Sequence, residues 1–132
     1  MRVLSIIGLS LLVACGSTAP DNSLGVQPKL EVTERSATTL RLRWDPIGTT
    51  NNYTVDYLVG VASCADFPPH NNIFPFTGTT VLLTGLSPAT RYHIHVHSLA
   101  VANQKTNTVF VLTLAAGATP QVVTAADYET CK

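Results

Sequence analysis

The sequence predicts an all-β protein, a Greek-key β-sandwich of about seven strands. Short segments of alternating apolar and polar residues recur along the chain, and the turn signals between them are spaced about 8–12 residues apart, which is typical of a sandwich. The charged fraction is only 12%, about half the usual quarter, and Thr and Val are abundant, as in exported β-rich domains. A chain of 132 residues is long enough to bury one real core.

The strongest single pattern is the stretch from Leu86 to Val96, which predicts a corner followed by a strand. Pro88 fixes its own φ and has no N–H to donate, so we expect it outside the ladder. Tyr92 and Ile94 share one face of the strand with Val96. A tyrosine at the start of such a strand can bury its ring and return its hydroxyl to the backbone of the preceding corner.

The other strands follow from the same alternation. We expect strands at residues 30–32, 39–44, 53–57, 79–83, 92–96 and 108–114, with a short edge strand at 73–77, and residues 121–124 can add a further short strand. The residues expected to form the structural core are Trp44, Tyr53, Tyr57, Leu86 and Tyr92.

Three of these patterns together resemble the fibronectin type III domain, an immunoglobulin-like β-sandwich. They are Trp44 followed by Asp, the alternation Tyr53-x-Val-x-Tyr57, and Leu86-x-Pro-x-Thr-x-Tyr92, in the family's order. The resemblance implies a fibronectin type III-like domain over residues 29–114, used as a protein- or glycan-binding module or as a spacer. Residues 115–132 lie beyond the family pattern, and we expect this tail to pack on the domain.

The N-terminus predicts an export signal. Residues 3–14 form an apolar run that is too short to span a bilayer, which needs roughly 20 residues, and that fits the central region of a secretory signal. The run ends in Leu12-Val13-Ala14-Cys15-Gly16, which resembles the lipobox of bacterial lipoproteins. The resemblance implies a signal peptide over residues 1–14 and a lipidated Cys15 as the new N-terminus.

Residues 15–28 then form the lipidated end and a flexible tether, rich in Gly, Ser, Thr and Pro. A tether of this length reaches at most about 45 Å. The expected location is the cell envelope, with the lipid anchor in the membrane. Because position 16 is not Asp, the family's sorting rule implies the outer membrane if the organism is Gram-negative.

Charge and motifs exclude several functions. Lys+Arg and Asp+Glu number 8 each, and loss of Arg2 with the signal leaves 7 basic residues, so no nucleic-acid partner is expected. The sequence has no Gly-x-Ser-x-Gly, phosphate-binding glycine loop or His-Glu-x-x-His motif. Asp56 and Asp66 have no evident partner. We therefore expect neither an enzyme nor a cofactor.

The row His93-x-His95-x-His97 is the one possible ligand-binding cluster. The three side chains share one face of the predicted strand, where adjacent imidazoles can converge on Zn²⁺ or Cu²⁺. No cysteine or acid is found at ligand spacing, so we interpret the row as polar outward positions and expect no metal. A histidine-based metal-binding lipoprotein and a structural subunit of an envelope complex remain as alternatives.

Two cysteines remain once Cys15 is lipidated. Cys64 and Cys131 form an even pair in an exported chain, where disulfides persist. The strands at 53–57 and 108–114 are expected to end at the same pole of the sandwich, so the tail leaves from the side where Cys64 lies. We predict a Cys64–Cys131 disulfide.

Overall fold

The structure is a computed structural model that describes residues 27–60, 71–100 and 104–131. The described residues form nine strands. They are β1 (Leu30–Arg35), β2 (Leu40–Trp44), β3 (Asn52–Val59), β4 (Asn71–Thr77), β5 (Thr80–Leu83), β6 (Arg91–Ser98), β7 (Thr108–Leu112), β8 (Gln121–Val122) and β9 (Glu129–Cys131). None of the described ranges contains a helix long and apolar enough to cross a membrane.

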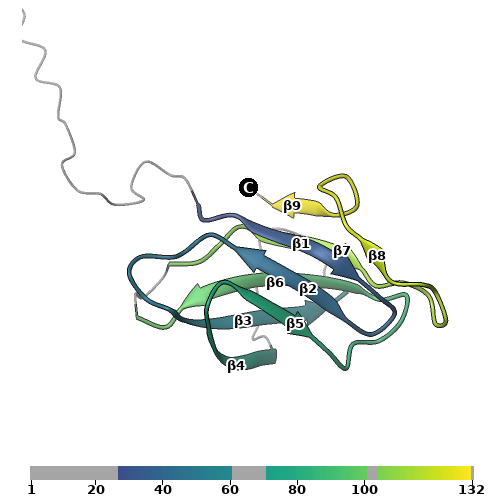
Figure 1. The fold of residues 1–132 in the computed structure, drawn as a ribbon, viewed down its shortest axis with the longest axis horizontal. Coiled ribbons are helices and arrows are strands. Elements are labelled where there is room, and N and C mark those ends of the chain that lie inside the picture. The colour runs from purple at the N-terminus through teal and green to yellow at the C-terminus, as the bar shows by residue number, and fades with distance from the viewer. Residues whose placement is uncertain (1–26, 61–70, 101–103, 132) are drawn as a thin grey trace, which may run out of the picture.

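The strands form two antiparallel sheets that face each other, as Figure 1 shows. One sheet has the order β5-β2-β1-β8, and the other has the order β4-β3-β6-β7-β9. The predicted β-sandwich is therefore confirmed. The main differences from the predicted strands are that β4 begins two residues earlier, β7 ends at Leu112, and the short strand β9 was not foreseen.

The core lies between the sheets and follows the predicted alternation. In β2 the side chains of Leu40, Leu42 and Trp44 are buried, whereas the intervening arginines are exposed. Apolar area removed from water on one face stabilises each strand. The ring of Trp44 meets that of Tyr53 edge to face, with ring centroids 5.5 Å apart, a favourable aromatic geometry.

The remaining residues expected in the core differ in how deeply they are buried. Leu86 and Tyr92 are buried. Tyr57 is only partly buried and packs against the core, with its ring centroid 5.9 Å from that of Tyr92.

The corner before β6 is held by two hydroxyl groups. The hydroxyl of Tyr92 accepts a hydrogen bond from the backbone N–H of Ser87 (2.8 Å). The hydroxyl of Thr113 donates to the carbonyl of Ser87 (2.7 Å) and accepts from the N–H of Thr90 (2.9 Å). These bonds satisfy backbone groups that a corner cannot pair in a ladder.

The tail lies along the edges of both sheets (Figure 1). Strand β8 pairs with β1, and β9 pairs with β7. Val123 is buried in the core between them, and Tyr128 packs against that core. Covering an edge in this way removes unpaired backbone groups on which another chain can add.

The strand polarity expected for the disulfide is present in the structure. Val59 at the end of β3 is paired with Tyr92, and Tyr92 with Val111 near the end of β7, so β3 and β7 end at one pole. Strand β9 then runs back along β7 and places the buried Cys131 directly opposite Thr108, the first residue of β7, and so toward the opposite pole from the end of β3. Cys64 lies outside the described residues, so the pairing stays a prediction.

Tyr92→Phe should lower the free energy of unfolding by about 1–3 kcal/mol, because the N–H of Ser87 loses its acceptor. Urea denaturation measures the change. Tyr57→Phe removes the same atom from a half-buried ring and should cost less than about 0.5 kcal/mol. Equal effects of the two substitutions would show that the corner hydrogen bond contributes nothing.

Peptide mapping without reductant should find Cys64 linked to Cys131. Loss of the crosslink in Cys131→Ser should cost roughly 4 kcal/mol by the chain-entropy estimate for a loop of this length. Two thiols that react with a labelling reagent in the native protein would contradict the pairing.

Candidate metal centre

Two neighbouring strands bring the candidate residues together. In the pairing of β3 with β6, Asp56 lies directly opposite His95, and Thr54 lies directly opposite His97. Directly opposite residues of an antiparallel pair point to the same face, with Cβ atoms about 4.5–5.5 Å apart. Asp56, His95 and His97 therefore share the outer face of the five-stranded sheet, while Val55 and its cross-strand partner Val96 belong to the core.

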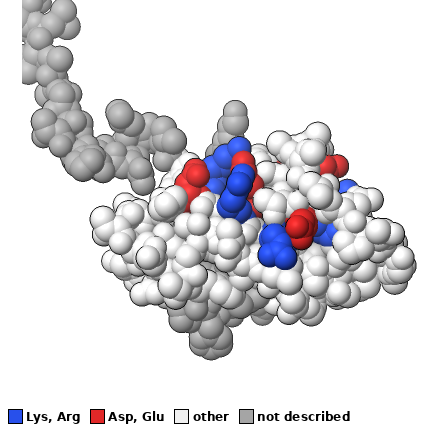
Figure 2. All heavy atoms as spheres, viewed as in Figure 1, with Lys and Arg blue, Asp and Glu red and all other residues white. Residues whose placement is uncertain are grey.

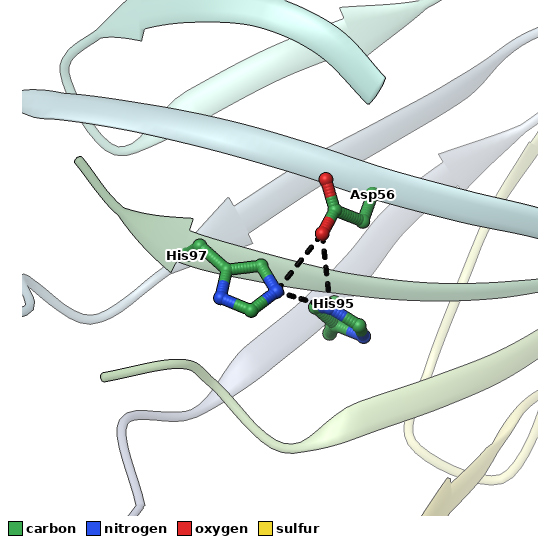
Figure 3. A group of neighbouring side chains, drawn as sticks. All are labelled: Asp56, His95 and His97. Carbon is green, nitrogen blue, oxygen red and sulfur yellow. Dashed lines mark hydrogen bonds and ion pairs between the residues drawn. The ribbon is translucent and has the colours of Figure 1, made fainter. Parts of the chain in front are cut away.

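The three side chains converge on one point, as Figure 3 shows. Oδ2 of Asp56 is 2.9 Å from Nε2 of His97 and 3.2 Å from Nε2 of His95. The two Nε2 atoms are 2.6 Å apart. We call these three residues the Asp–His–His cluster.

The cluster is mostly buried although it lies on an outer face. Asp56 is 8% exposed and His95 is 2% exposed. The side chain of His97 is 34% exposed, so it forms the side of the cluster that solvent reaches. The histidines lie on the outward face of β6, as expected, but His93 and His95 are buried there and are not exposed to solvent.

His93 belongs to a different arrangement. It is 1% exposed, and its ring is stacked on that of Phe110 with centroids 4.3 Å apart. The guanidinium of Arg91 lies 4.9 Å from the centre of the same Phe110 ring, a cation–π distance. Among the described residues, the histidines whose nitrogens converge with a carboxylate are His95 and His97, and His93 is not one of them.

Sequence reasoning missed the partner of the histidines. Asp56 was expected to have no partner and no acid was expected at ligand spacing, and both expectations are wrong. Asp56 lies between the inward residues Val55 and Tyr57, so alternation places it on the outward face of the strand, but alternation does not give the register between strands. Asp66, the other carboxylate considered, lies outside the described residues.

The electrostatics of the cluster favour a carboxylate. Burial by itself raises the pKa of Asp56, but hydrogen bonds from His95 and His97 and the positive charge of these rings outweigh it. The net result is a pKa of Asp56 well below its ordinary range. Asp56 is thus an anion at neutral pH, which is the form that can bind a cation.

Chemically, the cluster offers two imidazole nitrogens and one carboxylate oxygen. This is a ligand set for Zn²⁺ and for other divalent transition metals, with further coordination positions left for water. The same atoms can also form a hydrogen-bonded link between β3 and β6. The two roles differ in what a metal ion does to the protein.

Asp56→Asn should lower stability by about 1–3 kcal/mol near neutral pH, because a buried charge-assisted link is weakened. Since the folded-state pKa of Asp56 is lowered, its contribution is fully present above about pH 4 and is lost as the pH falls further. The difference between wild type and variant in urea denaturation should therefore stay constant from neutral pH down to about pH 4 and then shrink progressively as the pH falls toward the lowered pKa of folded Asp56. Glu34→Gln, at an exposed carboxylate, is the control and should cost less than about 0.5 kcal/mol. A stability difference between wild type and Asp56→Asn that does not change with pH would contradict the linkage.

Comparison with known proteins identifies the fold. The fn3 domain of the human collagen alpha-1(XX) chain is 23% identical, with a TM-score of 0.55 and coverage of 80% of this chain and 97% of that one. The FN5 domain of Drosophila Lar is 20% identical, with a TM-score of 0.50 and coverage of 67% and 96%. The FN1-FN3 domains of chicken CNTN1 are 19% identical, with a TM-score of 0.50 and coverage of 67% and 32%.

These likenesses show the fold alone, and no curated protein matches the sequence. The family profile of the fibronectin type III domain matches residues 26–111. The match begins shortly before β1 and ends within β7, so it includes β1 to β6 and most of β7. The chain belongs to the fibronectin type III domain family.

Proposed function

We propose that the chain is a lipid-anchored lipoprotein of the bacterial cell envelope, whose fibronectin type III domain is a protein- or glycan-binding module or a spacer. The main support is the order of the segments along the chain. The lipobox-like Leu12-Val13-Ala14-Cys15-Gly16 is followed by a short polar segment and then directly by the domain. Domains of this family are common binding and spacer modules in extracellular proteins.

The structure supports a fixed attachment point for the tether. The carbonyl of Pro28 accepts a hydrogen bond from the N–H of Asn107 (3.2 Å), and the side chain of Asn107 accepts from the N–H of Leu30 (2.8 Å). Lys29 and Asp45 form two further hydrogen bonds. The backbone N–H of Asp45 donates to the carbonyl of Lys29, and the backbone N–H of Lys29 donates to the carboxylate of Asp45. We call this end of the sandwich the tether pole, and the corner before β6 lies at the opposite pole.

The surface charge supports a partner that is not a polyanion. On the outer face of the four-stranded sheet, Arg43 and Lys29 both pair with Glu31, and Arg41 pairs with Glu34. Figure 2 shows basic and acidic groups side by side on the face of the molecule that it presents, with uncharged surface around them. Because the charges are paired, this face offers no basic patch to a nucleic acid.

A binding role also agrees with the family, whose domains are typically non-catalytic. We propose that the protein is not an enzyme. The domain then acts through its surface, held at the membrane by two or three acyl chains, which bind far better than one.

Mass spectrometry of the membrane-extracted protein should show a chain that begins at an acylated Cys15. Cys15→Ser should move the protein out of the membrane fraction, because the anchoring chains are lost. In a Gram-negative host, Gly16→Asp is the matched control: it keeps the lipid and should shift the protein from the outer to the inner membrane. A Cys15→Ser protein that stays in the membrane would refute the anchor.

Crosslinking in intact envelopes separates a binder from a spacer. A binding module should give a discrete crosslinked product through the exposed surface of the domain, and the same product should be lost when Cys15→Ser releases the protein. A spacer gives no discrete product.

A further inference from the structure

We propose that the Asp–His–His cluster binds one divalent transition-metal ion, Zn²⁺ or Cu²⁺, on the outer face of β3 and β6. The inference goes beyond the proposed function, since it concerns the domain itself and holds whether or not the protein is lipidated. It rests on the contacts among the three ligand atoms, their burial and the register that holds them.

The three contacts in the cluster cannot all be hydrogen bonds. If both Nε2 atoms carry a proton, both can donate to Oδ2 of Asp56, but the two N–H groups then face each other across 2.6 Å. If only one Nε2 carries a proton, the lone pair of the other faces the carboxylate oxygen. Every protonation state therefore leaves one unfavourable contact in a buried place.

A cation at the centre removes this conflict. With the protons of His95 and His97 on Nδ1, both Nε2 lone pairs and the carboxylate of Asp56 point toward the ion. Ligand distances of about 2.0–2.1 Å in tetrahedral geometry place the ligand atoms roughly 3.3 Å from one another. The observed separations of 2.6, 2.9 and 3.2 Å are shorter by up to several tenths of an ångström, and the half-exposed His97 has room to move outward.

The burial of the Asp56 carboxylate also favours a bound metal ion. Oδ1 of Asp56 is buried and has no hydrogen-bond partner among the described residues. A buried oxygen of a carboxylate that lacks a partner is costly. A metal ion offsets the charge of Asp56 and can accept Oδ1 as a second ligand atom.

The backbone holds the ligands in place before an ion binds. Pairing between β3 and β6 runs without a break from Tyr53, opposite Ser98, to Val59, opposite Tyr92. An isolated bridge to Lys105 fixes the backbone of His97 on the other side. Ligands on paired strands keep their positions better than ligands on loops, which favours metal affinity.

The ligand types select the class of metal. Imidazole nitrogens suit Zn²⁺ and Cu²⁺, whereas Ca²⁺ and Mg²⁺ take oxygen ligands. The cluster supplies one carboxylate against two imidazoles, so a transition metal fits and an alkaline-earth ion does not.

Isothermal titration of the full chain in detergent tests the proposal, with ZnCl₂ near neutral pH as the probe. Wild type should bind one Zn²⁺ and should melt at a higher temperature with it, while MgCl₂ should give neither effect. His97→Gln should weaken Zn²⁺ binding by roughly tenfold or more. This side chain is half-exposed, so the variant is expected to fold, which circular dichroism checks.

Two further variants keep the test decisive. Asp56→Asn removes the anionic ligand at nearly constant shape and should weaken binding as His97→Gln does. His93→Phe is the matched control, because it removes an imidazole from the same strand while keeping a flat ring against Phe110. It should bind Zn²⁺ like wild type.

Electron paramagnetic resonance with Cu²⁺ gives an independent readout. Wild type should show coupling to two imidazole nitrogens, and His97→Gln should show coupling to one. Absence of Zn²⁺ and Cu²⁺ binding by folded wild type would overturn the proposal. Equal Zn²⁺ affinity in wild type, His97→Gln and Asp56→Asn would also overturn it, since the ion would then bind elsewhere.

Discussion

The hydrogen-bonded corner before β6 determines where the central strand of the five-stranded sheet begins. The hydroxyls of Tyr92 and Thr113 hold the backbone of Ser87 and Thr90, so the position at which β6 begins is fixed. Strand β6 lies in the sheet between β3 and β7, and both neighbours take their register from it. A shift of β6 by one residue would turn every side chain of that strand to the other face. The meeting of Asp56 with the histidines of β6 therefore depends on a bond made at the opposite end of the strand.

The fold could be predicted well from the sequence because each strand has a recognisable pattern within its own segment. Alternation around Trp44 and the corner pattern ending in Tyr92 identify strands without knowledge of their neighbours. The cluster could not be predicted in the same way, because its key feature is which residue of β3 lies opposite His95. Nor does alternation say whether an outer face is covered: His93 is buried against Phe110 of the next strand, a contact between residues distant in sequence.

The cluster is costly for a domain that needs only stability. Replacing a buried ionic group by apolar residues of similar volume is often neutral or stabilising. Asp56 and His95 are almost fully buried on the outer sheet face, where a pair of apolar side chains could take their place without burying a charge. One benefit of such a group is a fixed register between β3 and β6, since a slip would bury an unpaired charge. Metal binding is a second benefit, and the two are compatible because both use the same register.

The position of the cluster limits what an ion can do to the domain. Asp56 and His95 lie on two strands whose pairing is already complete, and the connections at the tether pole and at the opposite pole are held by separate bonds at Asn107 and Ser87. An ion that binds folded protein alone stabilises it by mass action. Because the backbone around the cluster is already in its paired form, that free energy goes into the stability of the β3–β6 pair and not into a change of shape. Partner binding at the exposed surface of the domain and metal binding on its outer sheet face are thus expected to be energetically independent, unless the partner itself contacts the exposed ring of His97.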